Sequence, residues 1–120
     1  MLQLSHQSAV PKWLDLLPGV RVCVRPVTVA AILVARGEAG AVFRGEGADT
    51  DPQTSAKATA AMVRSLARYA ITDWEGVGDA RPVPVAPEAI EALMSLWPAY
   101  DSFDRLYVGP ALAGETEKNA

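Results

Sequence analysis

Residues 71–79, Ile-Thr-Asp-Trp-Glu-Gly-Val-Gly-Asp, constrain the fold of this chain more than any other stretch. A tryptophan packs most of its surface away from water and needs a partner for its indole N–H. Glycine adopts backbone angles that other residues avoid. The stretch stands between a helical pattern and the proline-rich run Arg81–Pro87. We therefore expect a specified turn with a packed Trp74, and not a slack linker.

The composition is that of a single folded domain. The chain has 120 residues, of which 50% are hydrophobic and 21% are charged, and its formal net charge is −3. Such a composition favours a globule over a disordered chain. A net negative charge gives no electrostatic reason to bind duplex nucleic acid or an anionic membrane.

The charges are unevenly placed along the chain. Residues 53–72 carry three basic residues and no acid, whereas residues 87–120 carry six acids against two basic residues. Two interpretations are open: helix faces that attract each other, or a docking surface for a protein partner.

The chain shows no sign of export. Cys23 is its only cysteine, so no intrachain disulfide can form, and a reducing compartment is expected. The N-terminus lacks the pattern of a signal peptide. The most apolar window, Val27–Ala35, is far too short to cross a bilayer. We expect a cytoplasmic protein with no membrane partner.

A β-hairpin is predicted near the N-terminus. Pro18-Gly19 is a pair typical of a type II turn, and Val20–Arg25 alternates strictly between valine and polar or cysteine residues. This alternation predicts a strand with one buried face. The hairpin should span about residues 12–26, and residues 1–11 are expected to be poorly ordered.

Two helices should follow the hairpin. Thr28 is suited to cap a helix that runs through Phe43. After a glycine-rich loop at residues 45–52, Thr54 or Ser55 can cap a second helix that ends near Thr72.

Two further helices are predicted after the proline run. Pro87 suits the first position of a helix, and an apolar stripe at i, i+3, i+4 and i+7 follows; its members are Ile90, Leu93, Met94 and Trp97. Pro98 should interrupt this helix, and a last helix is expected at about residues 99–108. Residues 111–120 read as a polar tail.

These elements predict an α+β fold: a small N-terminal β-hairpin followed by about four helices, mostly helical, with one domain at residues 12–110. Two strands alone form a marginal sheet. Either helices cover the hairpin, or its edge pairs with another copy.

No set of residues predicts catalysis or a bound cofactor. The sole histidine, His6, lies in the segment expected to be poorly ordered, and Cys23 has no nearby histidine in sequence to act as its base. Two such ligands cannot hold zinc. Asp73, Glu75 and Asp79 do not match a calcium loop. The chain is expected to be non-enzymatic, with no cofactor and no metal.

Large apolar side chains are the candidates for protein contact, because tryptophan and tyrosine often anchor interfaces. The alternative is that the stripe is simply the domain core. The candidate residues are Trp74, Ile90, Leu93, Met94, Trp97 and Tyr100.

Three motifs carry a resemblance to a known family. They are Val24-Arg25-Pro26-Val27-Thr28 at the end of the hairpin, Ile71-Thr72-Asp73-Trp74-Glu75-Gly76-Val77 after the second helix, and Pro87-Glu88-Ala89-Ile90. Together they resemble the tail assembly chaperones of long-tailed phages over residues 20–108. The turn after Asp79 departs from that pattern, with Ala80-Arg81 where relatives often have an acidic residue and a glycine.

The resemblance implies binding and not catalysis. Chaperones of this kind bind the tape-measure and tail-tube proteins in the bacterial host cytoplasm during tail assembly, are absent from the finished tail, and in several cases form homo-oligomers. An alternative function is a structural tail or connector component that stays in the virion.

Overall fold

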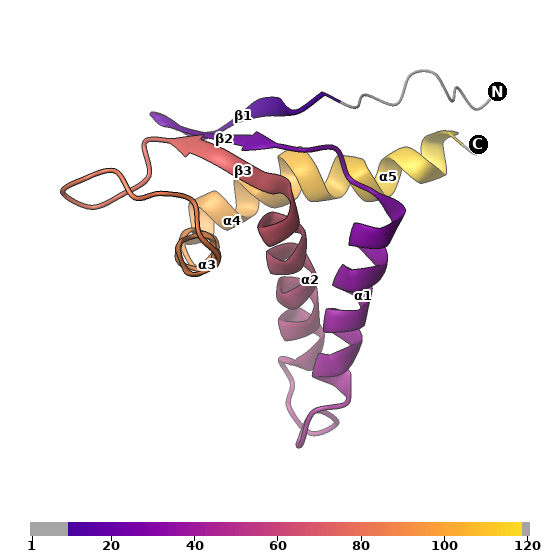
Figure 1. Cartoon of the computed structure of the whole chain (residues 1–120). Coiled ribbons are helices and arrows are strands. Elements are labelled where there is room, and N and C mark those ends of the chain that lie inside the picture. Colours follow the sequence, from indigo (N-terminus) through magenta and orange to yellow (C-terminus); the bar gives the residue numbers. More distant parts are fainter. Residues whose placement is uncertain (1–9, 119–120) are drawn as a thin grey trace.

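A three-stranded antiparallel sheet with helices on one side of it makes up the fold (Figure 1). The computed structural model describes residues 10–118. The predicted α+β class, an N-terminal hairpin followed by helices, is confirmed. His6 and most of the segment expected to be poorly ordered lie outside the described residues.

The hairpin forms where its sequence predicts it. Strands β1 (Lys12–Leu17) and β2 (Val20–Val24) pair antiparallel around Pro18-Gly19. Gly19 has φ 79°, the positive value that the third position of a type II turn requires.

A third strand was not predicted. Ile71–Glu75 was expected to belong to a turn, but it forms β3, which pairs with β2 and places Trp74 opposite Val22. The first residues of the stretch, Ile71 and Thr72, are β-branched, and such residues favour strands. The third strand supplies the partner that a lone hairpin lacks, and the turn begins only after Glu75.

The two faces of the sheet differ as the alternation of β2 predicts. Val22 and Val24 are buried against the helices. On the opposite face, Arg21 lies between two acids of the neighbouring strands, with its Nε 3.2 Å from Asp15 and its Nη1 3.5 Å from Glu75. The outer face is therefore polar and charge-paired.

Helices α1 (Val29–Phe43) and α2 (Thr54–Ala70) form a long hairpin that projects from the sheet (Figure 1). The predicted cap of α1 is confirmed, since the Thr28 hydroxyl accepts a hydrogen bond from the Ala31 N–H at 3.1 Å. The predicted cap of α2 is wrong. Thr54 is already helical, and its hydroxyl donates to the carbonyl oxygens of Ala48 and Asp51 in the preceding loop.

The predicted end of helix α3 (Pro87–Met94) is also wrong. Pro87 begins the helix as expected, but α3 stops at Met94, and Trp97 begins α4 (Trp97–Phe103). Pro98 therefore lies in the first turn of α4, where its missing N–H costs nothing. Trp97 therefore does not belong to the apolar stripe that begins at Ile90.

The last helix runs past its predicted end at residue 108. A π-helical turn, η2 (Asp104–Val108), connects α4 to α5 (Gly109–Lys118). In this turn the Gly109 N–H bonds to the Asp104 carbonyl oxygen. The π-turn is wider than an α-helical turn, so the chain remains helical through Pro110. In a regular α-helix the proline ring would clash with the carbonyl oxygen four residues earlier. Most of the predicted polar tail is thus helical backbone.

Two tyrosines tie the helices to the end of β2. The Tyr107 hydroxyl donates to the Arg25 carbonyl oxygen at 2.8 Å, and the Tyr69 hydroxyl donates to the Pro26 carbonyl oxygen at 3.0 Å. Burial raises the pKa of Tyr107 to about 12, and Tyr69 nearby adds to the rise. The chain between β2 and α1 is therefore held by side chains from α2 and η2.

The uneven charges along the chain meet in space. Arg68 of α2 pairs with Glu91 of α3 and, at 2.7 Å, with Glu38 of α1, while Arg64 lies 3.3 Å from Glu91. Burial alone would lower the pKa of Arg68, but its bonds to Glu91 and Glu38 outweigh burial and raise it. The interpretation as helix faces that attract each other is confirmed for Arg64 and Arg68 of the basic segment with Glu91 of the acidic one.

Candidate interaction groove

The loop after β3 is shaped by two glycines. Gly76 has φ 80°, and a Cβ there would lie 1.8 Å from the Gly19 carbonyl oxygen. Gly78 has φ 155°, and a Cβ there would lie 2.1 Å from the Arg81 carbonyl oxygen. Since no other residue fits at either position, the loop lies directly against the tip of the β-hairpin and then folds back on itself.

Trp74 fixes the returning arm of this loop. Its side chain is buried in the core, and its indole Nε1–H donates to the Val83 carbonyl oxygen at 2.6 Å. The Val83 N–H in turn donates to the Val77 carbonyl oxygen at 3.0 Å. The predicted packing of Trp74 and the need for an indole partner are both confirmed, and the proline run becomes one wall of a groove.

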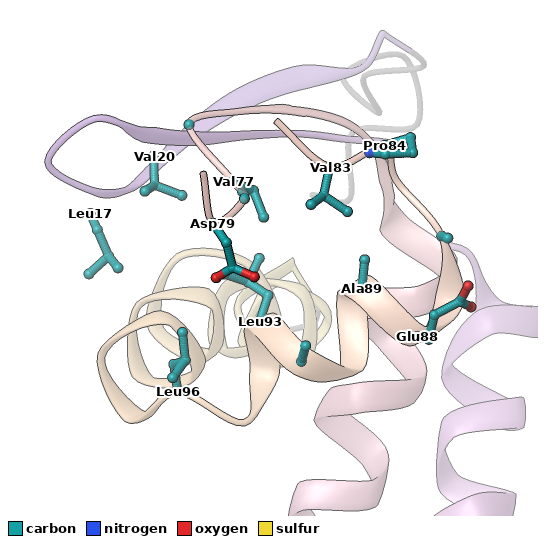
Figure 2. A pocket seen from close by; sticks show the side chains of 14 residues that line it. Leu17, Val20, Val77, Asp79, Val83, Pro84, Glu88, Ala89, Leu93 and Leu96 are labelled. Carbon is teal, nitrogen blue, oxygen red and sulfur yellow. The ribbon is translucent and has the colours of Figure 1, made fainter. Parts of the chain in front are cut away.

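The groove has a volume of about 510 Å³ and lies between three segments (Figure 2). The hairpin tip forms one side, the loop forms the second, and α3 with the residues just after it forms the third. This volume is in the range of pockets that hold a small ligand or a few side chains. Its apolar walls are formed chiefly by Leu17, Val20, Val77, Val83, Leu93 and Leu96.

Among the residues that the structure describes, two carboxylates are the charged groups that line the groove. Asp79 comes from the loop and Glu88 from the first turn of α3. Both side chains belong to exposed residues, and neither forms an ion pair with any residue that the structure describes. The groove therefore offers apolar walls that carry two carboxylates without ion-pair partners among the described residues.

Four of the six residues predicted as protein contacts lie in the core. Trp74, Ile90, Leu93 and Met94 are all buried, which agrees with the alternative that the stripe is the domain core. Among these four, only Leu93 lines the groove, at its floor in Figure 2.

The other two candidates lie next to the groove. Trp97 is 69% exposed, because α3 ends before it, and its ring stacks on Tyr100 at a centroid distance of 6.0 Å. Tyr100 is half-buried, and burial raises the pKa of its hydroxyl, with Asp104 adding to the rise. Leu96, which is 58% exposed, connects this aromatic pair to the groove.

The acids of the 71–79 stretch do not converge. The Asp73 carboxylate accepts from the Trp74 N–H at 2.8 Å, Glu75 pairs with Arg21, and only Asp79 faces the groove. Cys23 is opposite Asp73 on the outer face of the sheet. In the part of the chain that the structure describes, no three His, Cys, Asp or Glu side chains are grouped to hold a metal ion.

Helix α1 presents a second apolar surface. One side packs on α2, yet Val29, Leu33, Val34 and Phe43 are each more than half exposed. A helix that is apolar all round is ordinarily buried on all sides. These exposed side chains make α1 a second candidate interaction surface.

Sequence reasoning missed most of the groove walls. Leu17 and Val20 were assigned only to a hairpin, and Val77 and Val83 only to loop segments. The one available signal was the isolated valine between two glycines, Gly76-Val77-Gly78, since an apolar residue at a glycine turn needs a surface to pack on.

No known protein family matches the chain, and no curated protein or solved structure is similar enough to count as a match. Within residues 10–118, the helices are all too short or too polar to span a bilayer.

Proposed function

We propose that this protein is a non-enzymatic phage or prophage tail assembly chaperone that acts in the bacterial host cytoplasm. It binds apolar segments of the tape-measure and tail-tube proteins and keeps them available for tail assembly. The observation that carries the proposal is the apolar groove, with exposed Leu96 in its wall and exposed Trp97 next in the chain.

The groove suits this task because its walls are aliphatic and its shape is fixed. A tape-measure protein is long, apolar and helical, and it would aggregate without a partner. A chaperone for it must offer apolar surface that receives its segments. The hydrogen bond from Trp74 to Val83 holds one wall in place, so little conformational entropy is lost on binding.

Residues from two of the three motifs that carry the family resemblance build and support this site. Gly76 and Val77 belong to the loop, Trp74 of β3 holds its returning arm, and Pro87 begins the helix opposite it. Arg25 and Pro26 accept the hydrogen bonds of the two anchoring tyrosines. Two of the three motifs thus contain residues with structural tasks at the groove, while the first motif anchors the connection between β2 and α1.

Co-expression with the tape-measure protein tests the proposal. The wild-type chain should keep that protein soluble and co-purify with it, and Ala92→Phe, which fills the groove from α3, should lose most of the complex. Ala56→Phe, the same change on an exposed position of α2, is the matched control and should behave as wild type. Equal recovery with all three chains, or a tape-measure protein that is soluble alone, would sink the proposal.

Mass spectrometry of purified virions separates the chaperone from a structural tail or connector component. A chaperone should be absent from the particle. Recovery of this chain at a copy number comparable to that of the tail proteins would favour the structural alternative.

A further inference from the structure

We infer that the groove selects apolar segments that carry a basic side chain, and that Asp79 makes this selection. The inference deepens the proposed function and rests on it, because it assumes that the groove receives a segment of a partner protein.

Asp79 is placed to meet such a side chain. Figure 2 shows its carboxylate between Val77 of the loop and Leu93 of α3, in the middle of the groove. Gly78 before it and the bridge between Gly78 and Pro82 hold the loop that carries it. An apolar segment lying in the groove must therefore pass close to this carboxylate.

The carboxylate has no partner among the described residues, although many acids of this chain have one. Asp15 and Glu75 bind Arg21, Asp51 binds Lys57, and Asp101 binds Arg105. The nearest base in sequence to Asp79 is Arg81. Both residues line the small hollow of residues 76–82, but they form no ion pair with each other. The charge is left available to a ligand.

Charge complementarity identifies the class of ligand. A segment of aliphatic side chains can pack against the apolar walls of the groove. It would, however, cover Asp79 and remove water from the carboxylate without supplying a compensating partner, and this desolvation is unfavourable. A lysine or arginine within the segment supplies that partner. Glu88, to one side of Asp79 in the groove lining, extends the same preference, so an acidic segment meets repulsion from both carboxylates.

Glu88 alone would not support this conclusion, because an acid in the first turn of a helix is explained by the helix dipole. Asp79 has no such explanation, since it lies in a loop, whereas Asp73 of the same stretch binds the Trp74 N–H. The inference therefore depends on Asp79, with Glu88 as the weaker contributor.

Three matched synthetic peptides test the selection. They share a leucine-rich core, carry lysine, glutamine or glutamate at the same central position, and are capped at both ends so that no terminal charge contributes. Their affinities are measured by isothermal titration calorimetry at low and at physiological salt. The wild-type chain should bind the lysine peptide about tenfold more tightly than the glutamine peptide, as expected for a charge pair partly removed from water. The glutamate peptide should bind most weakly.

Variants of the chain assign the preference to the carboxylate. Asp79→Asn keeps the side-chain shape and should bring the lysine and glutamine peptides to nearly equal affinity, while Glu88→Gln should reduce the preference only in part. Asp49→Asn, an exposed acid in the loop between α1 and α2, is the matched control and should leave the preference unchanged. Asp79→Asn should melt with the wild type, because its carboxylate forms no ion pair or side-chain hydrogen bond with the described residues.

The outcomes separate this inference from the function that it deepens. Equal affinity of the wild type for the lysine and glutamine peptides, or a preference that survives Asp79→Asn, overturns the selection by charge and leaves groove binding in place. Failure of all three peptides to bind, or binding that Ala92→Phe does not weaken, overturns groove binding itself, and with it this inference.

Discussion

Removal of the Trp74 side chain should destabilise the domain strongly. The residue is 8% exposed, lies opposite Val22 in the sheet, and donates its indole N–H to the Val83 carbonyl oxygen. Truncation of a buried aromatic residue costs about 3–5 kcal/mol, because the lost packing leaves a cavity. Trp74→Ala should therefore remove a large part of the roughly 5–15 kcal/mol that stabilises a domain of this size.

A second substitution separates the two contributions of this side chain. Trp74→Phe keeps an aromatic ring in the core but leaves the Val83 carbonyl oxygen without its donor, which costs about 1–3 kcal/mol. The further decrease in the free energy of unfolding from Trp74→Phe to Trp74→Ala measures the contribution of packing. The phenylalanine variant should also loosen the loop that forms the groove wall, because Val83 belongs to it.

Urea denaturation followed by far-UV circular dichroism measures both effects, with Trp97→Ala as the matched control. Trp97 is 69% exposed, so its truncation should change the free energy of unfolding by only about 0.5 kcal/mol. If Trp74→Ala lowers the free energy of unfolding by less than about 1 kcal/mol, or by no more than Trp97→Ala does, the reasoning about the core is refuted. Unchanged stability with lost partner capture would instead place Trp74 at an interface.

Three further predictions concern the backbone of the groove, the start of α1 and the pH dependence of stability. Gly76→Ala should lower the free energy of unfolding by at least about 2 kcal/mol, since a Cβ would lie 1.8 Å from the Gly19 carbonyl oxygen. Gly19→Ala has φ 79° but open space around it, so it should lower the free energy of unfolding by only about 1 kcal/mol. Similar losses for the two variants in urea titrations would refute the clash. Thr28→Ala should cost about 1 kcal/mol through loss of the cap on α1, and Thr28→Asp should restore it; a thermal melt of Thr28→Ala equal to that of the wild type would contradict this. The pKa of Tyr107 is raised to about 12 from an ordinary value of 10, so the neutral hydroxyl stabilises the fold fully below pH 10, and this stabilisation is lost as pH rises to about 12. Tyr107→Phe should flatten the fall in melting temperature over that pH window, and an unaltered fall would show that other groups cause it.

Local signals in the sequence predict the fold as far as they determine single elements. The Pro18-Gly19 turn and the alternating strand after it give the hairpin, and Thr28 gives the start of α1. The start of α3 at Pro87 is equally local. Each of these features depends on a backbone preference or on a hydrogen bond within four residues.

The errors fall where residues distant in sequence decide the structure. Strand β3 forms because Ile71–Glu75 finds β2, some fifty residues earlier in the chain. A proline is compatible with the first turn of a helix as well as with its end, so Pro98 alone could not show that α3 stops at Met94. This error placed Trp97 on the apolar stripe, although it lies at the surface.

The groove could not be predicted from the sequence, because three segments that are far apart in the chain form it. Leu17 comes from the hairpin, Val77 from the loop and Leu96 from the short connection between α3 and α4. These residues come together because Gly76 lies against Gly19, a contact that no local sequence pattern predicts. The stretch around Trp74 was identified correctly as a specified, packed structure, but its task at the groove follows only from the arrangement in space.

Hydrogen–deuterium exchange of the chain alone and in complex with the tape-measure protein tests most directly whether the groove receives the partner. Binding in the groove predicts slower exchange in residues 76–84 and 88–96, with little change at the outer face of the sheet. Protection confined to the α1–α2 hairpin, or no protection around the groove in a complex that nevertheless forms, would contradict the proposed mode of binding.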